Sequence, residues 1–424
     1  MASVTLVEPP AVVPPSPGAA GLLRSDRIVS VDLLRGIVMV LMALDHVRDY
    51  FTYLAFAPED LTRTYGWLFF TRWMTHFCAP TFFFLTGTGA YLALSHGKTT
   101  GQISRFFLTR GLWLVFLELT VIGFAWTFVL GMSYGGVIWC LGWCMVLMAV
   151  LVRLPVKWLG VFGIALIALH NLTDKIDPVR FGKLAWVWTV LHVPGGIPFP
   201  GRPGGFFILY PLVPWIGVMA VGYAFGTVLR KPAAERQRAT FVVGAMATVL
   251  FVALRATGLY GNPPAGLEFG IPFSAGPWQH YPSLTLTVIS FFNVEKYPPS
   301  LLYLLMTLGP SLVCLEWLDR ATQDGRLNRL GRWILVFGRV PMFFYVLHIF
   351  VIHLLTLVVA RLFHQPTWQL LHGAFWAGPP EPGYGHGLPF IYAMWALTVV
   401  LLYGPCAWFA GLKARRKEWW LSYL

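Results

Sequence analysis

IVSVDLLRGIVMVLMALDHVRDYF, from Ile28 to Phe51, is an apolar run long enough to cross a bilayer as one helix. It nevertheless carries Asp32, Arg35, His46 and Asp49. Together with two methionines between them, these residues recur at steps of three and four, which places them on one stripe of a helix. Ionisable groups at membrane depth are costly and usually functional. The run therefore predicts a helix that turns charged groups toward the interior of a membrane protein.

The composition of the whole chain is that of a membrane protein. Of its 424 residues, 57% are hydrophobic and 12% are charged, and the mean hydropathy is +0.65. The segment Leu284–Phe292 is apolar but too short to cross, and it reads as an interfacial or re-entrant piece. The sequence predicts an all-α, polytopic integral membrane bundle of about ten transmembrane helices. Its expected spans are 30–52, 68–93, 104–127, 134–152, 155–172, 206–229, 238–258, 298–318, 335–362 and 388–411.

Basic residues gather in alternate loops, as they do on the cytoplasmic side of membrane proteins. This pattern predicts that both termini are cytoplasmic. It also explains the net charge of +13 without a nucleic-acid partner. The loops and tail concerned hold Lys98 and Arg105; Arg153 and Lys157; Arg230, Lys231, Arg236 and Arg238; Arg320, Arg326, Arg329 and Arg332; and Lys413, Arg415, Arg416 and Lys417.

Three parts of the chain are expected. Residues 1–27 are rich in Pro and Ala and predict a flexible cytoplasmic tail, residues 28–412 a transmembrane domain, and residues 413–424 a basic cytoplasmic tail. The five cysteines all lie in apolar spans, which favours small buried side chains over a disulfide or a metal site. We expect no metal.

His46 is the strongest candidate for chemistry. Asp49 stands three residues after it, so a carboxylate can hold one ring nitrogen and leave the other as a base. The alternative is a structural His–Asp pair that braces two helices.

Two further histidines are candidates in the same half of the bundle. His76 follows Arg72 by one turn; Arg72 is placed to neutralise Asp45 or Asp49, in which case His76 and Arg72 are a brace. Pro80 predicts a kink in this helix. His348 follows Tyr345 on one helix face. The candidate site residues in this half are therefore His76, His348, Asp45, Arg72 and Tyr345.

Basic residues elsewhere complete the candidate site. Arg35 lies about 16 Å from His46 along the helix, at a rise of ~1.5 Å per residue. A guanidinium inside an inner cavity can bind phosphate, although Asp32 offers a plain intrahelical salt bridge instead. Arg339 is a second candidate of this kind. Lys296, in KYPPSLLYLLMTLGP, either lines the outer mouth or simply precedes a helix start.

The run SVDLLRGIVMVLMALDH, Ser30 to His46, resembles the first span of bacterial membrane proteins grouped with heparan-alpha-glucosaminide N-acetyltransferase. The spacing from Arg35 to His46 also resembles the first-span signature of a wider family of membrane acyltransferases that modify surface sugars. RWMTHFCAPTFFFLTG, YPLVPWIGVMAVGYAFG, KYPPSLLYLLMTLGP and LKARRKEWWLSYL are similar to the same bacterial group.

This resemblance implies a protein of a bacterial inner (plasma) membrane, built as a bundle of about ten or eleven helices. Acyl-CoA enters from the cytoplasm, and an acceptor on the outer face receives the acyl group. The resemblance maps the family's arginine onto Arg35 and its histidine onto His46. This sequence differs from the heparan-modifying enzyme at this point. In that enzyme the essential histidine lies beyond the first span, and an asparagine stands at the position of His46. Because the loop after Phe51 has no histidine, His46, His76 or His348 has to take that role.

We therefore expect a membrane-bound O- or N-acyltransferase that moves an acetyl (acyl) group from cytoplasmic acetyl-CoA to a polar acceptor, by resemblance a glycan, at the outer face. Arg35 and Arg339 would hold the CoA phosphates. His76 and His348 would position the acceptor or stabilise the oxyanion. The residues expected to bind the substrate are Asp45, Arg72, Tyr345 and Lys296. The expected partners are the lipid bilayer, acyl-CoA and the acceptor. A homodimer is compatible with the sequence, which does not decide the oligomeric state. The rival function is a proton-coupled transporter or flippase, in which the stripe from Asp32 to Asp49 relays protons. A third is a non-catalytic assembly or sensor protein.

Overall fold

The computed structural model describes residues 28–95, 97–131, 133–201, 204–263, 267–268, 271–272, 276–373, 378–416 and 418–423. The expected tail over residues 1–27, and Lys417 in the expected C-terminal tail, lie outside the described residues.

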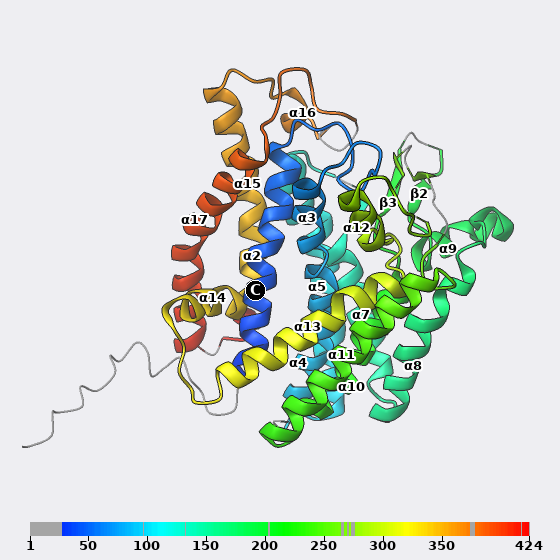
Figure 1. Ribbon diagram of the computed structural model, residues 1–424. Coiled ribbons are helices and arrows are strands. Elements are labelled where there is room, and N and C mark those ends of the chain that lie inside the picture. The colour runs from blue at the N-terminus through cyan, green and yellow to red at the C-terminus, as the bar shows by residue number, and fades with distance from the viewer. Residues whose placement is uncertain are drawn as a thin grey trace, which may run out of the picture.

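Helical segments stand at all ten expected spans within the described residues (Figure 1). Eight are long and apolar enough to cross a membrane. The other two are α2 (Val29–Phe51), which carries the charged stripe, and α7 (Val137–Leu151), which has 15 residues. The expected all-α, polytopic membrane bundle is confirmed. The segments are α2 (Val29–Phe51), α3 and α4 (Gly66–Thr75, Cys78–Ser95), α5, η1 and α6 (Thr100–Leu117, Glu118–Ile122, Gly123–Thr127), α7 (Val137–Leu151), α8 (Val156–Leu169), α10 (Leu212–Leu229), α11 (Ala233–Thr257), α13 (Leu301–Ala321), α15 (Pro341–Leu362) and α17 (Leu388–Arg415).

Short elements cover the ends of the bundle. The segment expected to be too short to cross forms the nine-residue helix α12 (Leu284–Phe292), which packs on α3. Three small strands, β1 (Tyr134–Gly135), β2 (Gly195–Pro198) and β3 (Gly205–Ile208), form one sheet. Their order is β1-β3-β2, with β1 parallel and β2 antiparallel to β3. These elements are β1 (Tyr134–Gly135), η2 (His170–Thr173), η3 (Pro178–Leu184), α9 (Ala185–Leu191), β2 (Gly195–Pro198), β3 (Gly205–Ile208), β4 (Leu267–Glu268), β5 (Ile271–Pro272), α14 (Arg329–Arg339), α16 (Trp368–Leu371) and η4 (Trp419–Ser422).

Helix α2 lies at the centre of its half of the bundle, packed against α4, α13, α14, α15 and α17 (Figure 1). Most of its side chains are buried, including Asp32, Asp45 and Arg48. A helix with this many charges is stable at membrane depth because protein groups surround it and can pair with its side chains. The charged stripe therefore faces the interior, as its periodicity predicts.

The second expected span is broken between α3 and α4, at His76 and Phe77. Pro80 has no N–H to donate to the carbonyl of His76, four residues earlier, and its ring disfavours a continuous helix there. The Tyr303 hydroxyl of α13 donates to that carbonyl at 2.8 Å. The kink expected from Pro80 is therefore present, and a neighbouring helix satisfies the freed backbone group.

The predicted start of the ninth span, at residue 335, is wrong, because the helix that spans begins at Pro341. α14 ends at Arg339, Val340 has φ −130° and ψ 50°, and α15 begins with Pro341. Proline pushes the preceding residue out of the helical region and is itself favoured in the first turn of a helix. α14 then crosses α2 closely, since a Cβ at Gly338 would meet the Asp32 carbonyl oxygen at 1.8 Å.

Candidate functional site

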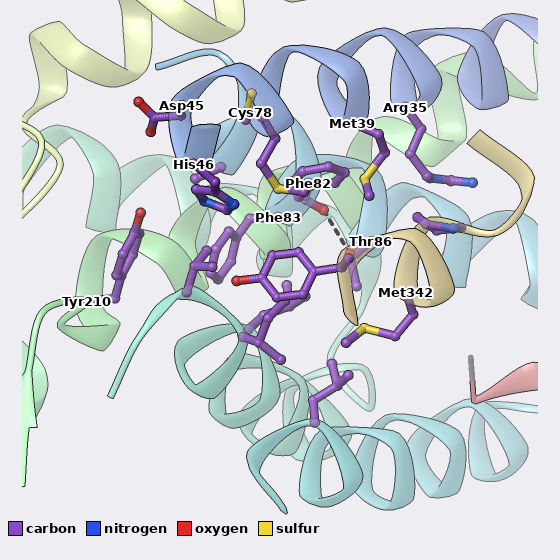
Figure 2. Close-up of a pocket in the computed structure, with 18 of the residues that line it drawn as sticks. Arg35, Met39, Asp45, His46, Cys78, Phe82, Phe83, Thr86, Tyr210 and Met342 are labelled. Carbon is purple, nitrogen blue, oxygen red and sulfur yellow. Dashed lines mark hydrogen bonds between the residues drawn. The ribbon is translucent and has the colours of Figure 1, made fainter. Parts of the chain in front are cut away.

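A pocket runs alongside the stripe of α2 toward α4, α5 and α7, and its free space, open ends included, is about 940 Å³ (Figure 2). Figure 2 shows Arg35 and Met342 toward one end, His46, Asp45 and Tyr210 toward the other, and Met39, Phe82 and Thr86 between. The lining residues are Arg35, Met39, Met42, Asp45, His46, Thr75, Cys78, Ala79, Phe82, Phe83, Thr86, Arg110, Leu114, Val137, Ile138, Leu141, Met145, Tyr210, Lys296, Pro341, Met342 and Tyr345. The pocket is thus mainly apolar along its length and polar at its ends.

His46 is half-buried on the pocket wall and pairs with a second histidine behind it. Its Nδ1 lies 2.7 Å from Nε2 of His348, a fully buried residue of α15. The two rings are stacked with centroids 4.9 Å apart, and Trp126 meets the His46 ring edge-on at 4.8 Å. These contacts fix the orientation of the His46 ring.

The hydrogen bonds also determine which nitrogen carries the proton in each neutral ring. His348 Nδ1 lies 2.5 Å from the Tyr345 carbonyl oxygen and 3.1 Å from that of Phe344. Carbonyls only accept, so this nitrogen is the N–H and Nε2 of His348 is the acceptor. His46 then donates from Nδ1, and its Nε2 keeps a lone pair. A nitrogen of this kind on a pocket wall can act as a general base.

Asp49 does not orient His46, contrary to the expectation from its spacing. Its carboxylate accepts from the Arg48 guanidinium at 2.5 Å, while His348 takes the His46 ring nitrogen. The physical reason is that a charged guanidinium binds a carboxylate more strongly than a neutral imidazole does. Spacing along one helix placed Asp49 near His46 but did not decide its partner.

A buried charge network lies behind the His46 end of the pocket. Asp45 accepts from Arg48 at 3.0 Å and from Arg72 at 2.5 Å. Arg72 also donates from Nε to Glu59, on the loop after α2, at 2.7 Å. Burial by itself raises the pKa of the Glu59 carboxyl, but the Arg72 guanidinium and the neighbouring His76 outweigh it and hold that pKa well below its usual range.

His76 belongs to this network and is not among the lining residues of the pocket. Its Nε2 lies 3.5 Å from Glu59 Oε1, and its ring packs on Tyr303. Arg72 neutralises Asp45, one of the two carboxylates named for it from the sequence. The geometry therefore gives Arg72 and His76 a bracing position, behind Asp45, and not direct access to the pocket.

Besides Asp45, the polar side chains at the His46 end of the pocket include Tyr345, Lys296 and Tyr210. The ring centroids of Tyr345 and His46 are 6.3 Å apart, the Lys296 charge is near enough to act on His46, and Figure 2 shows Tyr210 beside His46. Tyr345 and Lys296 were expected near the substrate. Tyr210 precedes α10, and burial together with its neighbour Tyr297 raises the pKa of its hydroxyl, which therefore remains a neutral donor. Lys296 is buried to 7% exposure.

The other end of the pocket is cationic. Arg35 donates to Asp32 at 2.8 Å and to the Gly338 carbonyl at 3.1 Å, so the intrahelical salt bridge is present. Arg110 of α5 lines the same pocket, near enough to Arg35 for the two charges to repel. Arg339 was expected to bind the same phosphates as Arg35, but it is not among the residues that line the pocket. It is the last residue of α14, and the break at Val340 separates it from the membrane-spanning helix α15.

Sequence reasoning missed Arg110, Tyr210 and Glu59. An arginine inside the apolar run ISRFFLTRGLWLVFL is a signal of the same kind as Arg35 and was available from the sequence. Tyr210 stands in a segment without regular periodicity, and Glu59 is in a loop, so only packing reveals their positions.

The fold and the site together define a multi-pass membrane protein with an internal pocket that joins a cationic end to a histidine pair. The family model for the heparan-alpha-glucosaminide N-acetyltransferase catalytic domain matches residues 27–257, more than half of the chain, and the chain belongs to this family. It is therefore a transmembrane acetyltransferase in general terms. No curated protein matches the chain significantly. The matched region contains Arg35, His46 and Arg110, whereas Lys296 and His348 follow it.

Proposed function

We propose that this protein transfers an acyl group from acyl-CoA, bound through the Arg35 end of the pocket, to a hydroxyl or amine of a polar acceptor at the His46 end. The observation that carries this proposal is that a single pocket is lined by both Arg35 and His46. The two residues are separated by about 16 Å along α2, a span that suits an extended substrate with an anionic head and a reactive tip.

The cationic end suits the phosphates of CoA. Guanidinium groups bind phosphate through paired N–H donors, and Arg35 and Arg110 both reach the pocket wall. Between the ends, Met39, Met42 and Phe82 give an apolar wall that a thioester arm can lie against. Acyl-CoA would supply an activated acyl thioester.

His46 acts as the general base and then as the general acid. Its Nε2 takes the proton of the acceptor O–H or N–H as the new bond to the acyl carbon forms, and returns it to the sulfur as the carbon–sulfur bond breaks. His348 accepts from His46 Nδ1 throughout and so favours the imidazolium that forms transiently. Lys296 and the Tyr210 hydroxyl line the same pocket and would stabilise the negative charge on the carbonyl oxygen.

The acceptor is proposed to be a glycan or a related polar compound, and its end of the pocket to open toward the outer face of a bacterial inner membrane. The alternation of basic loops supports this direction, because it puts the Arg35 end on the cytoplasmic side together with both termini.

Thermal stabilisation tests the proposal. The purified full chain should melt at a higher temperature with acetyl-CoA than with free acetate at equal concentration, because a ligand that binds the folded state stabilises it. Arg110→Gln should reduce this shift, and Arg326→Gln, on an exposed loop, should not. Equal melting temperatures with acetyl-CoA and acetate, together with uptake of a solute driven by a proton gradient, would favour the transporter instead.

A further inference from the structure

A second pocket, here the His170–His192 pocket, lies where α8 ends and η2 begins. Its walls come from α8, η2, α9 and the start of α10, and its free space, open side included, is about 640 Å³. Apolar side chains form most of the wall, but His170 and His192 also line it. None of the lining residues is shared with the Arg35–His46 pocket.

Both histidines are buried, at 5% and 1% exposure, and each is held by one ring nitrogen only. His170 Nδ1 lies 3.0 Å from the Ile167 carbonyl oxygen and 3.2 Å from that of Leu166. His192 Nε2 lies 3.1 Å from Asp174 Oδ1 and 3.2 Å from Thr173 Oγ1, whose own hydroxyl donates to the His170 carbonyl. The remaining nitrogens, His170 Nε2 and His192 Nδ1, are buried without a hydrogen-bond partner in the described chain.

The partners determine what these two nitrogens need. Carbonyls and carboxylates accept, and the Thr173 hydroxyl has already donated its proton to the His170 carbonyl, so the held nitrogens are the N–H groups. In neutral rings His170 Nε2 and His192 Nδ1 are therefore lone-pair acceptors. A buried acceptor without a donor is destabilising. Two histidines that line one pocket and each keep such an acceptor suit a ligand that carries several donors. The Asp174 carboxylate behind His192 favours a positive ligand.

The setting of the pocket indicates where such a ligand comes from. α8 lies at the edge of the bundle (Figure 1), and Ile164, Leu169 and Leu172 are 60%, 55% and 68% exposed at this end, which in a membrane means contact with lipid. Phe162 and Leu169 offer an apolar wall beside the histidines. Within the described residues no group of three or more metal-binding side chains forms here or elsewhere.

We propose that the His170–His192 pocket binds a phospholipid whose head group carries a primary ammonium. The ammonium donates to His170 Nε2 and His192 Nδ1, and the acyl chains lie against Phe162 and Leu169. This inference does not depend on acyl transfer, because the pocket and its residues are separate from those of the proposed reaction.

Head-group methylation tests the proposal on the unmodified protein. Phosphatidylethanolamine, its N-methyl and N,N-dimethyl forms, and phosphatidylcholine differ in the number of N–H donors but share their acyl chains. Delipidated protein should bind phosphatidylethanolamine roughly tenfold more tightly than phosphatidylcholine, as expected for hydrogen bonds to a charged group, with the methylated forms between. Equal affinities across the series, measured by native mass spectrometry and melting temperature, would overturn it.

Substitutions test whether the preference for phosphatidylethanolamine arises in the His170–His192 pocket. His170→Leu should abolish the preference for phosphatidylethanolamine while leaving the melting temperature in phosphatidylcholine near that of the parent. His280→Leu, an exposed histidine on another loop, is the matched control and should keep the preference. Preference retained in His170→Leu, or stabilisation by Zn²⁺ in place of phosphatidylethanolamine, would contradict the lipid assignment.

Discussion

His46 Nδ1 lies 2.7 Å from Nε2 of His348, a residue 302 positions further along the chain. The first residue stands in the region that matches the family and the second lies beyond it. The orientation of the proposed base therefore depends on α15, a helix that packs against α2 only in the folded bundle.

His46→Ala should lower acyl transfer by about 10²–10⁴-fold, the usual contribution of a general base. Donor binding should survive, since the cationic end of the pocket is unchanged. Turnover with acetyl-CoA and the acetyl-CoA-induced shift in melting temperature measure the two effects. Wild-type turnover in this variant would remove His46 from the reaction.

His348→Phe should lower kcat by roughly 10- to 100-fold, because the imidazolium of His46 loses a hydrogen bond worth about 1.5–3 kcal/mol. His348→Gln keeps an acceptor on a side chain of similar length and should recover part of the rate. Asp49→Asn is the comparison: Asp49 is paired with Arg48, so its effect on kcat should be smaller. If kcat rises from His348→Phe through His348→Gln to the wild type, His348 acts by positioning His46. An equal loss of kcat in both variants would instead indicate a packing defect.

Arg35→Lys should weaken acetyl-CoA binding by roughly tenfold and leave acceptor KM nearly unchanged, because a lysine lacks the planar fork that binds phosphate. Asp32→Asn tests the structural alternative, since Asp32 is the salt-bridge partner of Arg35. Calorimetric titration of acetyl-CoA and melting temperatures distinguish the readings. If both variants lower the melting temperature without changing acetyl-CoA affinity, Arg35 is only a structural residue.

Glu59 should make the stability of the protein fall in acid. The folded-state pKa of Glu59 lies well below its unfolded value of about 4.3. Its stabilising contribution is therefore complete above about pH 4.3 and decreases as pH falls toward the folded-state pKa, by at most about 1.4 kcal/mol per pH unit. Glu59→Gln should lower the melting temperature at pH 7 and flatten its decline below pH 4.3.

Asp60→Asn is the control for this pH dependence. Asp60 lies on the same loop, and its carboxylate bonds to Thr62 within that loop. Its substitution should leave the slope of melting temperature against pH close to that of the parent protein. A parent slope that persists in Glu59→Gln would show that other carboxylates control the acid transition.

The orientation in the membrane is tested by cysteine labelling. Arg326→Cys lies on an exposed loop proposed to be cytoplasmic, and Gln279→Cys on an exposed loop proposed to be outside. An impermeant maleimide added to intact cells should label the second variant alone. The background should be low, because four of the five native cysteines are buried and Cys314 is partly so. Labelling of Arg326→Cys from outside would reverse the proposed topology.

Local features of the chain were predictable from the sequence because they depend on neighbours. Length and hydropathy predicted the ten spans, the steps of three and four predicted the inward stripe of α2, and Pro80 predicted the break beside His76. Pro341 likewise indicates a helix boundary, and α15 begins there, so the predicted span 335–362 started six residues too early. The pairs Arg35–Asp32 and Arg72–Asp45 were predictable as well, the first from helical spacing and the second from charge.

The sequence by itself thus determined a polytopic helical membrane protein with Arg35 and His46 on one inward stripe, because hydrophobicity and helical period act over a few residues. Only the tertiary structure decided that His348 and not Asp49 holds His46, that Arg110 and not Arg339 joins Arg35, and that Lys296 and Tyr210 face the same pocket. Periodicity places a side chain on a face of its own helix. Which distant helix meets that face depends on close packing across the whole bundle.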